Sequence, residues 1–234
     1  MLLDESLPDE SIWGAATCSF ELRPDEVHVW HVEPHPSEAF ARRFSSFLSP
    51  EEQDRAARFS LERQRSGFLL ARGAIRYLLG RYLDADPAGL EFRYGSHGKP
   101  LMRGGGIEFS VTRSSGLIAC AFACRGDVGI DIERIRPVAR TAEIAERFFT
   151  LEEQAEIGRS DSAARLHAFF RCWTRKEAFL KATGEGLPGL ANPAAASHAW
   201  TVRDLEAPPG YVGAVVWSRR PAPVTVHRYN LALT

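Results

Sequence analysis

Residues 165–184 read RLHAFFRCWTRKEAFLKATG, and this stretch guides the interpretation of the rest of the chain. Its large apolar residues fall on one side of a helix that turns about 100° per residue; they are Leu166, Phe169, Phe170, Trp173 and Leu180. Lys176 and Glu177 lie on the same side, so we expect Glu177 to face the body of the protein. A carboxylate there needs a compensating charge, which either a salt bridge with Lys176 or Lys181 or a bound metal ion would supply.

The composition is that of an ordinary globular protein. The chain has 234 residues, of which 44% are hydrophobic and 25% are charged, and its net charge is -1. This length allows one large domain or two small ones, and this charge favours neither nucleic acid nor a membrane as a partner. The longest apolar run, residues 117–123, is far too short to cross a bilayer, and the N-terminus lacks the apolar core of an export signal.

Cysteine usage points to the cytoplasm. Cys18, Cys120, Cys124 and Cys172 form no CxxC pair, so neither a zinc site nor a disulfide framework is indicated. We expect four reduced thiols in a cytoplasmic protein.

Strand and helix signals occur twice in the same order. A strand pattern at residues 27–32 precedes a capping box, Ser49-Pro50-Glu51-Glu52, and a helical pattern at 64–82. A strand pattern at 128–133 precedes a second box, Thr150-Leu151-Glu152-Glu153, and a long amphipathic helix. A shift of 101 residues superimposes these signals, although the identities are few and chance similarity is the alternative. We predict an α+β fold of two pseudo-symmetric halves, residues 1–124 and 125–234, that meet near residues 123–127.

Turn and strand signals fill the remaining segments. A loop at residues 95–100 and a glycine turn at 104–106 precede two strands at 109–111 and 117–122, which we expect to be joined by a turn at 112–115. After the helix, a loop at 188–196 precedes strands near Trp200, at 211–217 and at 224–229.

Three acids are the strongest candidates for chemistry. Asp131 and Glu133 share the polar face of the strand at 128–133, about 7 Å apart, and Glu177 is a third acid that its helix turns inward. Only the second half carries them, so we expect one site per chain. Oxygen ligands without a nearby histidine suit Mg²⁺, which often keeps waters and bridges to substrate phosphates. The alternative is a half-exposed strand with solvated acids.

Several basic residues could bind a phosphate beside such a metal. Lys181 follows Glu177 by one helical turn, although a lysine there could simply stabilise the helix end. Arg113 is expected in the hairpin turn among hydroxyl groups, either binding phosphate or solvated. Lys99 stands between a glycine and a proline, where a plain turn is the alternative. The chain has no Walker loop, dinucleotide-binding fingerprint, GxSxG elbow or HExxH motif.

Together these stretches resemble the 4′-phosphopantetheinyl transferases of the Sfp-like superfamily. The matching segments are Gly98-Lys99-Pro100, FSVTRS at 109–114, GIDIE at 129–133 and WTRKEAFLK at 173–181, the last close to the family pattern WxxKEAxxK. The resemblance covers residues 27–187, and GIDIE followed by WTRKEAFLK is its most specific part. It implies a monomer of two pseudo-symmetric halves with the active site in the cleft between them.

The resemblance also implies a metal site and a catalytic group. Asp131, Glu133 and Glu177 would hold Mg²⁺ on the pyrophosphate of coenzyme A. Lys181 would contact phosphate and assist the departure of 3′,5′-ADP. Glu177 directly, or a water on the metal, would act as the base that activates the acceptor hydroxyl.

Other residues would bind coenzyme A. By resemblance, Lys99 and Pro100 would border the nucleotide and Lys176 would support the site. Arg113, followed by Ser114, stands where the family usually has a histidine against the 3′-phosphate, and we expect both residues at the coenzyme.

The implied reaction transfers 4′-phosphopantetheine from coenzyme A to a serine of an apo acyl, peptidyl or aryl carrier protein. Two other functions stay open from the sequence. One is a non-catalytic protein of the same fold that binds carrier proteins or nucleotides, and the other is a Mg²⁺-dependent nucleotide pyrophosphatase.

Overall fold

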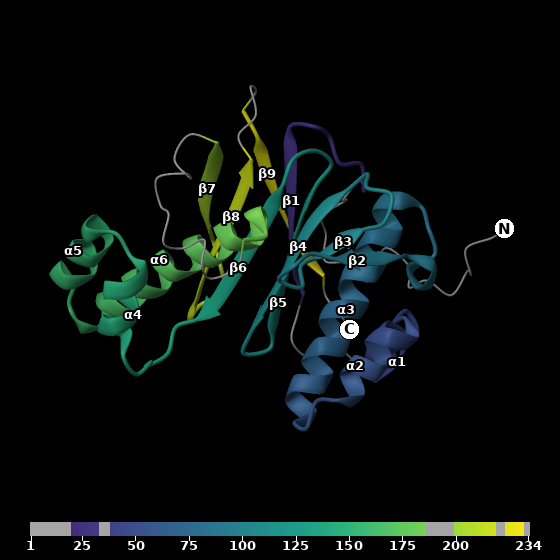
Figure 1. Cartoon of the computed structure of the whole chain (residues 1–234), viewed down its shortest axis with the longest axis horizontal. Helices are drawn as coiled ribbons and strands as arrows, with labels where there is room; N and C mark the ends of the chain where they lie inside the picture. Colours follow the sequence, from purple (N-terminus) through teal and green to yellow (C-terminus); the bar gives the residue numbers. More distant parts are fainter. Residues whose placement is uncertain (1–19, 33–37, 186–198, 219–222, 232–234) are drawn as a thin grey trace.

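The computed structural model describes residues 20–32, 38–185, 199–218 and 223–231, and these form an α+β fold, as predicted (Figure 1). The first half contains β1 (Glu26–Val32), α1 (Glu38–Ser46), α2 (Pro50–Ala57), α3 (Glu62–Leu83), the 3-10 helix η2 (Pro87–Gly89), β2 (Phe92–Tyr94), β3 (Pro100–Met102), β4 (Glu108–Ser114) and β5 (Leu117–Ala123). The second half contains β6 (Val128–Arg134), α4 (Thr141–Phe148), α5 (Leu151–Arg159), α6 (Ser162–Thr183), β7 (Trp200–Leu205), β8 (Tyr211–Ser218) and β9 (Thr225–Leu231). The loop predicted at 188–196 lies outside the described residues.

Both predicted capping boxes form, and each begins a short helix. The Ser49 hydroxyl accepts a hydrogen bond from the backbone N–H of Glu52, whose side chain accepts one from the Ser49 N–H. Thr150 and Glu153 repeat this arrangement at α5. In each half the long helix is the next one, α3 or α6, so the helical segment expected after Thr150 is divided in two.

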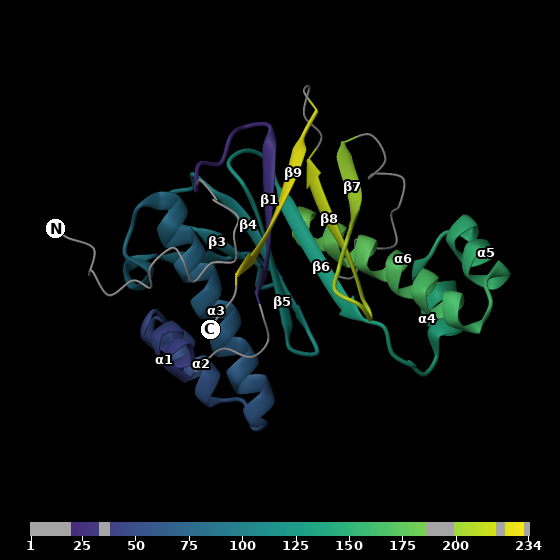
Figure 2. The same cartoon turned by 180° about the vertical axis from the view of Figure 1, so that it is seen from behind.

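The strands form two main sheets that lie between two groups of helices. The four-stranded sheet has the order β4-β5-β1-β9, in which only β9 and β1 are parallel. The three-stranded antiparallel sheet has the order β6-β8-β7, and β2 pairs with β3 separately. Figures 1 and 2 show α1–α3 on one side of these sheets and α4–α6 on the other.

Apolar contacts hold the layers together. On α3, Leu78 and Leu79 pack against the outer face of the four-stranded sheet. Val29 of β1 and Ile130 of β6 belong to a second cluster between the two sheets. Helix α6 covers the three-stranded sheet through small side chains; the buried members of this contact are Ala178, Ala182, Ala214 and Val216.

One hairpin differs from the sequence prediction in a way that affects the site. The predicted turn at 112–115 is wrong, because β4 continues to Ser114 and the chain reverses at Ser115 and Gly116. Both of these residues have positive φ, 48° and 97°, as a two-residue hairpin turn requires. Arg113 is therefore a strand residue and not a turn residue.

The two halves share one sheet. Strand β9 belongs to the predicted second half, yet it pairs with β1 along its whole length. The division of the chain near residue 124 and the pseudo-symmetry of the halves stay predictions.

The described cysteines and helices can be compared with two predictions from the sequence, reduced thiols and no membrane span. Cys120, Cys124 and Cys172 are unpaired, whereas Cys18 lies outside the described residues. No helix within the described ranges combines the length and apolar character needed to cross a membrane.

Candidate active site

Strand β6 passes very close to helix α6, and Gly129 makes this approach possible. A Cβ atom at position 129 would clash with backbone atoms of Ala178 and Ala182. Because Ile130 points into the core between the sheets, the alternate residues Asp131 and Glu133 lie on the face turned to α6. The GIDIE motif thus places two acids beside the helix that carries Glu177 and Lys181.

Asp131 is the most buried of the three candidate acids, with 4% of its surface exposed. Its Oδ1 accepts hydrogen bonds from Lys181 Nζ at 2.7 Å and from the Thr112 hydroxyl at 2.8 Å. Its Oδ2 is buried and has no hydrogen-bond partner among the described residues. A buried carboxylate oxygen without a donor is expected where a cation completes its interactions.

The other two acids are harder to ionise than free glutamates. Burial raises the pKa of Glu133, against the opposing effect of a 2.6 Å hydrogen bond from the Ser114 hydroxyl. Burial also raises the pKa of Glu177, and the negative charge of Asp131 adds to this effect. Bound cations would relieve both causes, since they stabilise the charged carboxylates.

These residues line a cleft between the two halves of the chain. Its walls come from α2, α3 and β4 on one side and from β6 and α6 on the other. The cleft contains Asp131, Glu133, Glu177 and Lys181, and it also contains Arg113. Five of the nine site residues that the sequence predicts therefore lie around one space.

The Arg113 side chain extends from β4 into the cleft, and Gly67 of α3 leaves space for it. Its Nη1 donates to the Gln64 carbonyl at 3.4 Å, a long hydrogen bond. A Cβ at Gly67 would lie 2.6 Å from the same Nη1 atom, so the glycine leaves room for the guanidinium. The weak anchoring of Arg113 leaves its donors available to an anion.

Two further arginines line the cleft, and sequence reasoning missed both. Arg55 lies on α2 with its guanidinium over the Phe68 ring. Arg72 is 8% exposed, and its Nη1 atom is buried without a hydrogen-bond partner in the described part of the chain. The sequence shows that Phe68 and Arg72, four residues apart, share a face of α3, but it does not show that this face borders the cleft. With Lys181 and Arg113, these arginines make the cleft suitable for a ligand with several phosphates.

The remaining predicted residues lie outside the lining of this cleft. Lys176 forms an ion pair with Glu153 at 2.9 Å. Lys99 Nζ donates to the carbonyls of Val128 and Ala182, at 3.2 and 3.3 Å, and so links β6 to α6.

The other two predicted coenzyme ligands are also engaged elsewhere. Pro100 begins β3. The Ser114 hydroxyl donates a hydrogen bond to Glu133 and accepts one from the Arg134 N–H.

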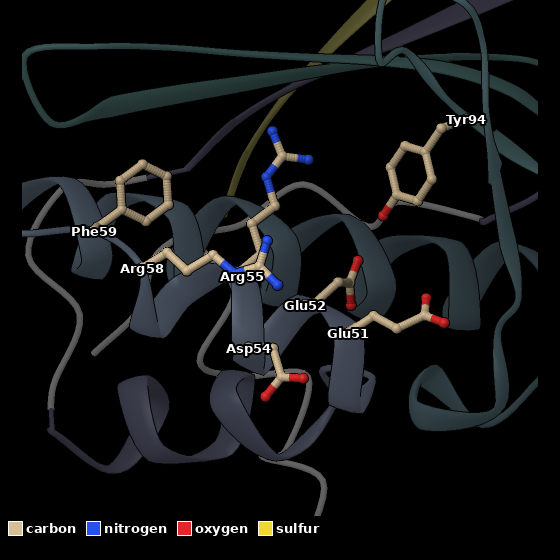
Figure 3. A pocket seen from close by; sticks show the side chains of 7 residues that line it. All are labelled: Glu51, Glu52, Asp54, Arg55, Arg58, Phe59 and Tyr94. Carbon is tan, nitrogen blue, oxygen red and sulfur yellow. The ribbon is translucent and has the colours of Figure 1, made fainter.

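A second hollow adjoins the cleft along α2 (Figure 3). Arg55 and Phe59 line both spaces, so the two are continuous on this side of the molecule. Figure 3 shows Tyr94 across the hollow from Phe59, with the acids of α2 between them. This hollow mixes acidic and basic groups and lacks the buried carboxylate cluster of the cleft.

Comparisons with known proteins indicate the family of the chain. Residues 127–227 match the family model described as the 4′-phosphopantetheinyl transferase superfamily. This segment includes Asp131, Glu133, Glu177 and Lys181, whereas Arg113 precedes it.

The chain is also similar to several curated proteins. It is 35% identical to the 4′-phosphopantetheinyl transferase HetI of Nostoc sp., over 76% of this chain and 77% of that protein. It is 32% identical to the 4′-phosphopantetheinyl transferase Sfp of Bacillus subtilis, over 62% of this chain and 64% of the relative. A third relative, AcpT of Salmonella typhimurium, is 40% identical over 47% of this chain and 57% of its own length.

Proposed function

This chain belongs to the 4′-phosphopantetheinyl transferase superfamily, and we propose that it transfers 4′-phosphopantetheine from coenzyme A to a serine hydroxyl of an apo acyl, peptidyl or aryl carrier protein. The second product would be 3′,5′-ADP. The observation that carries this proposal is the gathering of three carboxylates, Lys181 and three arginines around one cleft. Such a cleft can bind both a divalent cation and the phosphates of coenzyme A.

Mg²⁺ fits the acidic part of the cleft. Asp131, Glu133 and Glu177 offer only oxygen ligands, and the buried Oδ2 of Asp131 lacks a hydrogen-bond partner among the described residues. When bound there, Mg²⁺ would neutralise the charge that builds on the pyrophosphate as its bond breaks.

The basic residues would hold the phosphates. Lys181 projects from the last turn of α6 with a 31% exposed side chain, so its ammonium can contact the 5′-phosphate of the departing 3′,5′-ADP as well as Asp131. We assign the 3′-phosphate to Arg113, whose planar guanidinium can bind two phosphate oxygens at once. Arg55 and Arg72 would add positive charge along the wall that faces the acids.

Glu177 is the base in this proposal. Its carboxylate lines the cleft beside Asp131 and Lys181, where a bound acceptor serine could give up its proton to it. The deprotonated serine oxygen would then attack the β-phosphorus, and the cleft would supply the alignment between nucleophile and leaving group.

Three of the four predicted ligands outside the cleft lining receive positioning roles. Ser114 orients Glu133, and Lys99 fixes β6 against α6 close to Pro100. Lys176 joins α6 to α5 through Glu153. We further propose that the protein acts as a monomer in the cytoplasm.

The test uses intact-mass spectrometry of several apo carrier proteins incubated with the chain, coenzyme A and Mg²⁺. The expected result is a carrier heavier by one phosphopantetheine group, with release of 3′,5′-ADP that depends on the carrier serine. Release of free phosphopantetheine without any carrier would instead identify a pyrophosphatase. Binding of coenzyme A without either product would identify a non-catalytic protein.

A further inference from the structure

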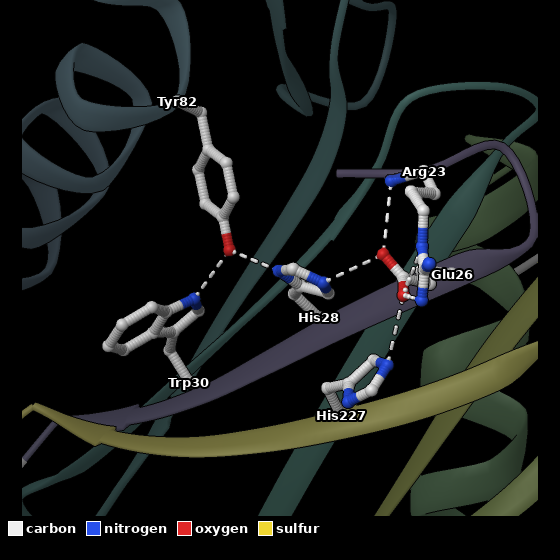
Figure 4. A network of polar contacts seen from close by, with 6 residues as sticks. All are labelled: Arg23, Glu26, His28, Trp30, Tyr82 and His227. Carbon is white, nitrogen blue, oxygen red and sulfur yellow. Dashed lines mark hydrogen bonds and ion pairs between the residues drawn. The ribbon is translucent and has the colours of Figure 1, made fainter. Parts of the chain in front are cut away.

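A second group of metal-ligating side chains lies on β1 and β9, outside the cleft. Glu26 and His28 are two residues apart on β1 and share one face of the sheet, and the register pairs His28 with His227 of the parallel strand β9. The three side chains converge between the two strands (Figure 4). Nothing in the proposed transfer reaction uses them.

Their ligand atoms lie close enough together for one metal ion to bind all three. One ligand atom from each of Glu26, His28 and His227 lies within 4.8 Å of the other two. His28 Nε2 is 3.4 Å from one Glu26 oxygen, and His227 Nε2 is 3.2 Å from the other. Ligands about 2.1 Å from a tetrahedral Zn²⁺ are themselves separated by roughly 3.4 Å, so only small adjustments are needed.

His28 is oriented by a contact at its other ring nitrogen. The Tyr82 hydroxyl accepts a hydrogen bond from Trp30 Nε1 at 2.8 Å and lies 2.8 Å from His28 Nδ1. This contact leaves Nε2 directed at Glu26 (Figure 4). A hydroxyl can accept from an Nδ1–H as well as donate to Nδ1, so it can support the tautomer in which Nε2 binds a metal.

Arg23 is the group that a metal would have to displace. Its Nε and Nη2 donate to Oε1 of Glu26 at 2.8 and 2.5 Å, so it neutralises the carboxylate when no metal is bound. The Arg23 side chain is 69% exposed, whereas that of Glu26 is 5% exposed. The arginine can therefore leave for solvent while the carboxylate stays in place. His227, at 38% exposed, gives an ion access from the same side.

We propose that Glu26, His28 and His227 bind a divalent transition-metal ion of the Zn²⁺ class, with water as the fourth ligand. Such an ion would join β9 to β1 and stabilise the four-stranded sheet at the strand that comes from the second half. The proposal is independent of the transfer reaction.

The first test is a Co²⁺ titration of the full-length protein, followed by visible absorption, with excess Mg²⁺ present to occupy oxygen-only sites. We expect one equivalent of Co²⁺ with the intense bands of tetrahedral coordination. His227→Gln, a change at a partly exposed residue, should weaken binding at least tenfold. The matched control is His167→Gln, at an exposed histidine of α6, which should titrate like wild type. Absence of these bands, or bands that survive His227→Gln, would overturn the proposal.

The second test is thermal unfolding with Zn²⁺. At a free concentration near 100 times the dissociation constant, Zn²⁺ should raise the Tm of wild type by about 5 to 10 °C. It should leave the Tm of His227→Gln unchanged. Arg23→Gln should bind metal at least as tightly as wild type, because the competing cation is gone. Equal stabilisation of the His227 variant, or weaker binding by the Arg23 variant, would show that the ligand set is wrong.

Discussion

The two halves begin their helices by the same local rules, but α2 and α3 present a different surface from α5 and α6. Capping boxes at Ser49 and Thr150 begin the short helices, and α3 and α6 are each 22 residues long. The side chains of Gln53 and Gln154 each donate to the backbone carbonyl five residues earlier, at 3.1 and 3.0 Å. The signals that start and orient the helices are thus nearly the same in the two halves.

The difference lies in how each long helix uses its charged residues. In each half the glutamate of the capping box pairs with a cation of the long helix: Glu52 with Arg76 at 2.7 Å, and Glu153 with Lys176 at 2.9 Å. By this ion pair, Lys176 corresponds to Arg76, and the next residue, Glu177, corresponds to the buried Tyr77. A constant shift of 101 residues would instead align Glu177 with Arg76. The first half keeps its inward charge in an ion pair, whereas the second half turns an extra carboxylate into the cleft.

The largest effect should come from that extra carboxylate. Glu177→Gln should slow phosphopantetheine transfer by on the order of 10³ to 10⁴-fold, because it removes both a metal ligand and the base. Stability should not fall, since the change removes a negative charge beside Asp131. Intact-mass kinetics and thermal unfolding measure the two effects. Tyr77→Phe, at the counterpart position, should leave transfer unchanged; an unfolded or fully active Glu177 variant would contradict the assignment.

The largest stability effect should come from the first half. Arg76 is 2% exposed, pairs with the buried Glu52, and donates through Nη1 to the carbonyls of Pro87 and Leu90. Arg76→Ala removes these contacts and leaves Arg72, at 3.9 Å, as the nearest cation to Glu52 among the described residues. We expect a loss of about 3 to 5 kcal/mol in the free energy of unfolding, measured by urea denaturation. A loss below about 1 kcal/mol would mean that Glu52 finds another partner or a proton at little cost.

Arg113 tests whether the first half contributes to coenzyme binding. Arg113→Ala should weaken coenzyme A binding by about 1.5 to 3 kcal/mol, the value of a charged hydrogen bond. Calorimetry with 3′-dephospho-coenzyme A is the control, and there the variant should bind like wild type.

A histidine at position 113 sharpens the same test. Arg113→His should make affinity decline as pH rises from 6.5 to 8.5, because the imidazole loses its charge and arginine does not. An equal loss by Arg113→Ala with both coenzymes would place the arginine away from the 3′-phosphate.

Lys176 should matter much less than Arg76, although both pair with a cap glutamate. The side chains of Lys176 and Glu153 are 13% and 24% exposed, so water screens their attraction more strongly. Lys176→Met should cost about 1 kcal/mol or less in unfolding free energy. It should leave the KM for coenzyme A within a factor of about three, roughly 0.6 kcal/mol. A KM raised tenfold or more would show that Lys176 contributes to coenzyme binding.

The smallest expected effect is a pH dependence of the metal-free protein. The raised pKa values of Glu133 and Glu177 mean that the folded state holds protons which the unfolded state has already lost above its ordinary pKa of 4.5. Their contribution to stability is thus complete below that value and is lost as pH rises through the folded pKa values. Glu26, whose pKa falls to about 2 beside Arg23, changes stability only below pH 4.5 and with the opposite sign.

Thermal unfolding between pH 5 and 8 separates these contributions. As pH rises, the Tm of wild type should fall by about 1 to 3 °C more than the Tm of Glu177→Gln, and Mg²⁺ should reverse this difference. Parallel pH profiles for the two proteins would show that Glu177 does not hold an extra proton.

Short-range patterns explain why much of the fold could be predicted from the sequence. Caps, alternation and helical spacing depend on neighbours within a few residues, and they located β1, α2, α3, β6 and α6. The same periodicity predicted that Asp131 and Glu133 share one face of a strand and that Glu177 faces inward from its helix. Helices α1 and α4 were not predicted.

Long-range contacts explain what the sequence prediction missed. We predicted a turn at the polar residues that end β4, because the groups to which they hydrogen-bond lie in the other half of the chain. The hydroxyl of Ser110 accepts from the Ile130 N–H, that of Thr112 donates to Asp131, and that of Ser114 donates to Glu133. Arg55 and Arg72 were missed for the same reason, because only the packing of the halves shows which face borders the cleft.

The parallel pairing of β1 with β9 also constrains how the chain can be synthesised and divided. It joins residues 26–32 to residues 225–231, so β1 lacks one neighbour until nearly all of the described chain has left the ribosome. An unpaired edge of this kind promotes aggregation, and pairing across such a sequence separation is slow. A fragment that ends near residue 124 would keep the capping box of α2 and the helix α3 but would expose the backbone groups of β1. The first sheet is therefore completed by the second half, and expression of the halves as separate proteins should yield insoluble material where the whole chain folds.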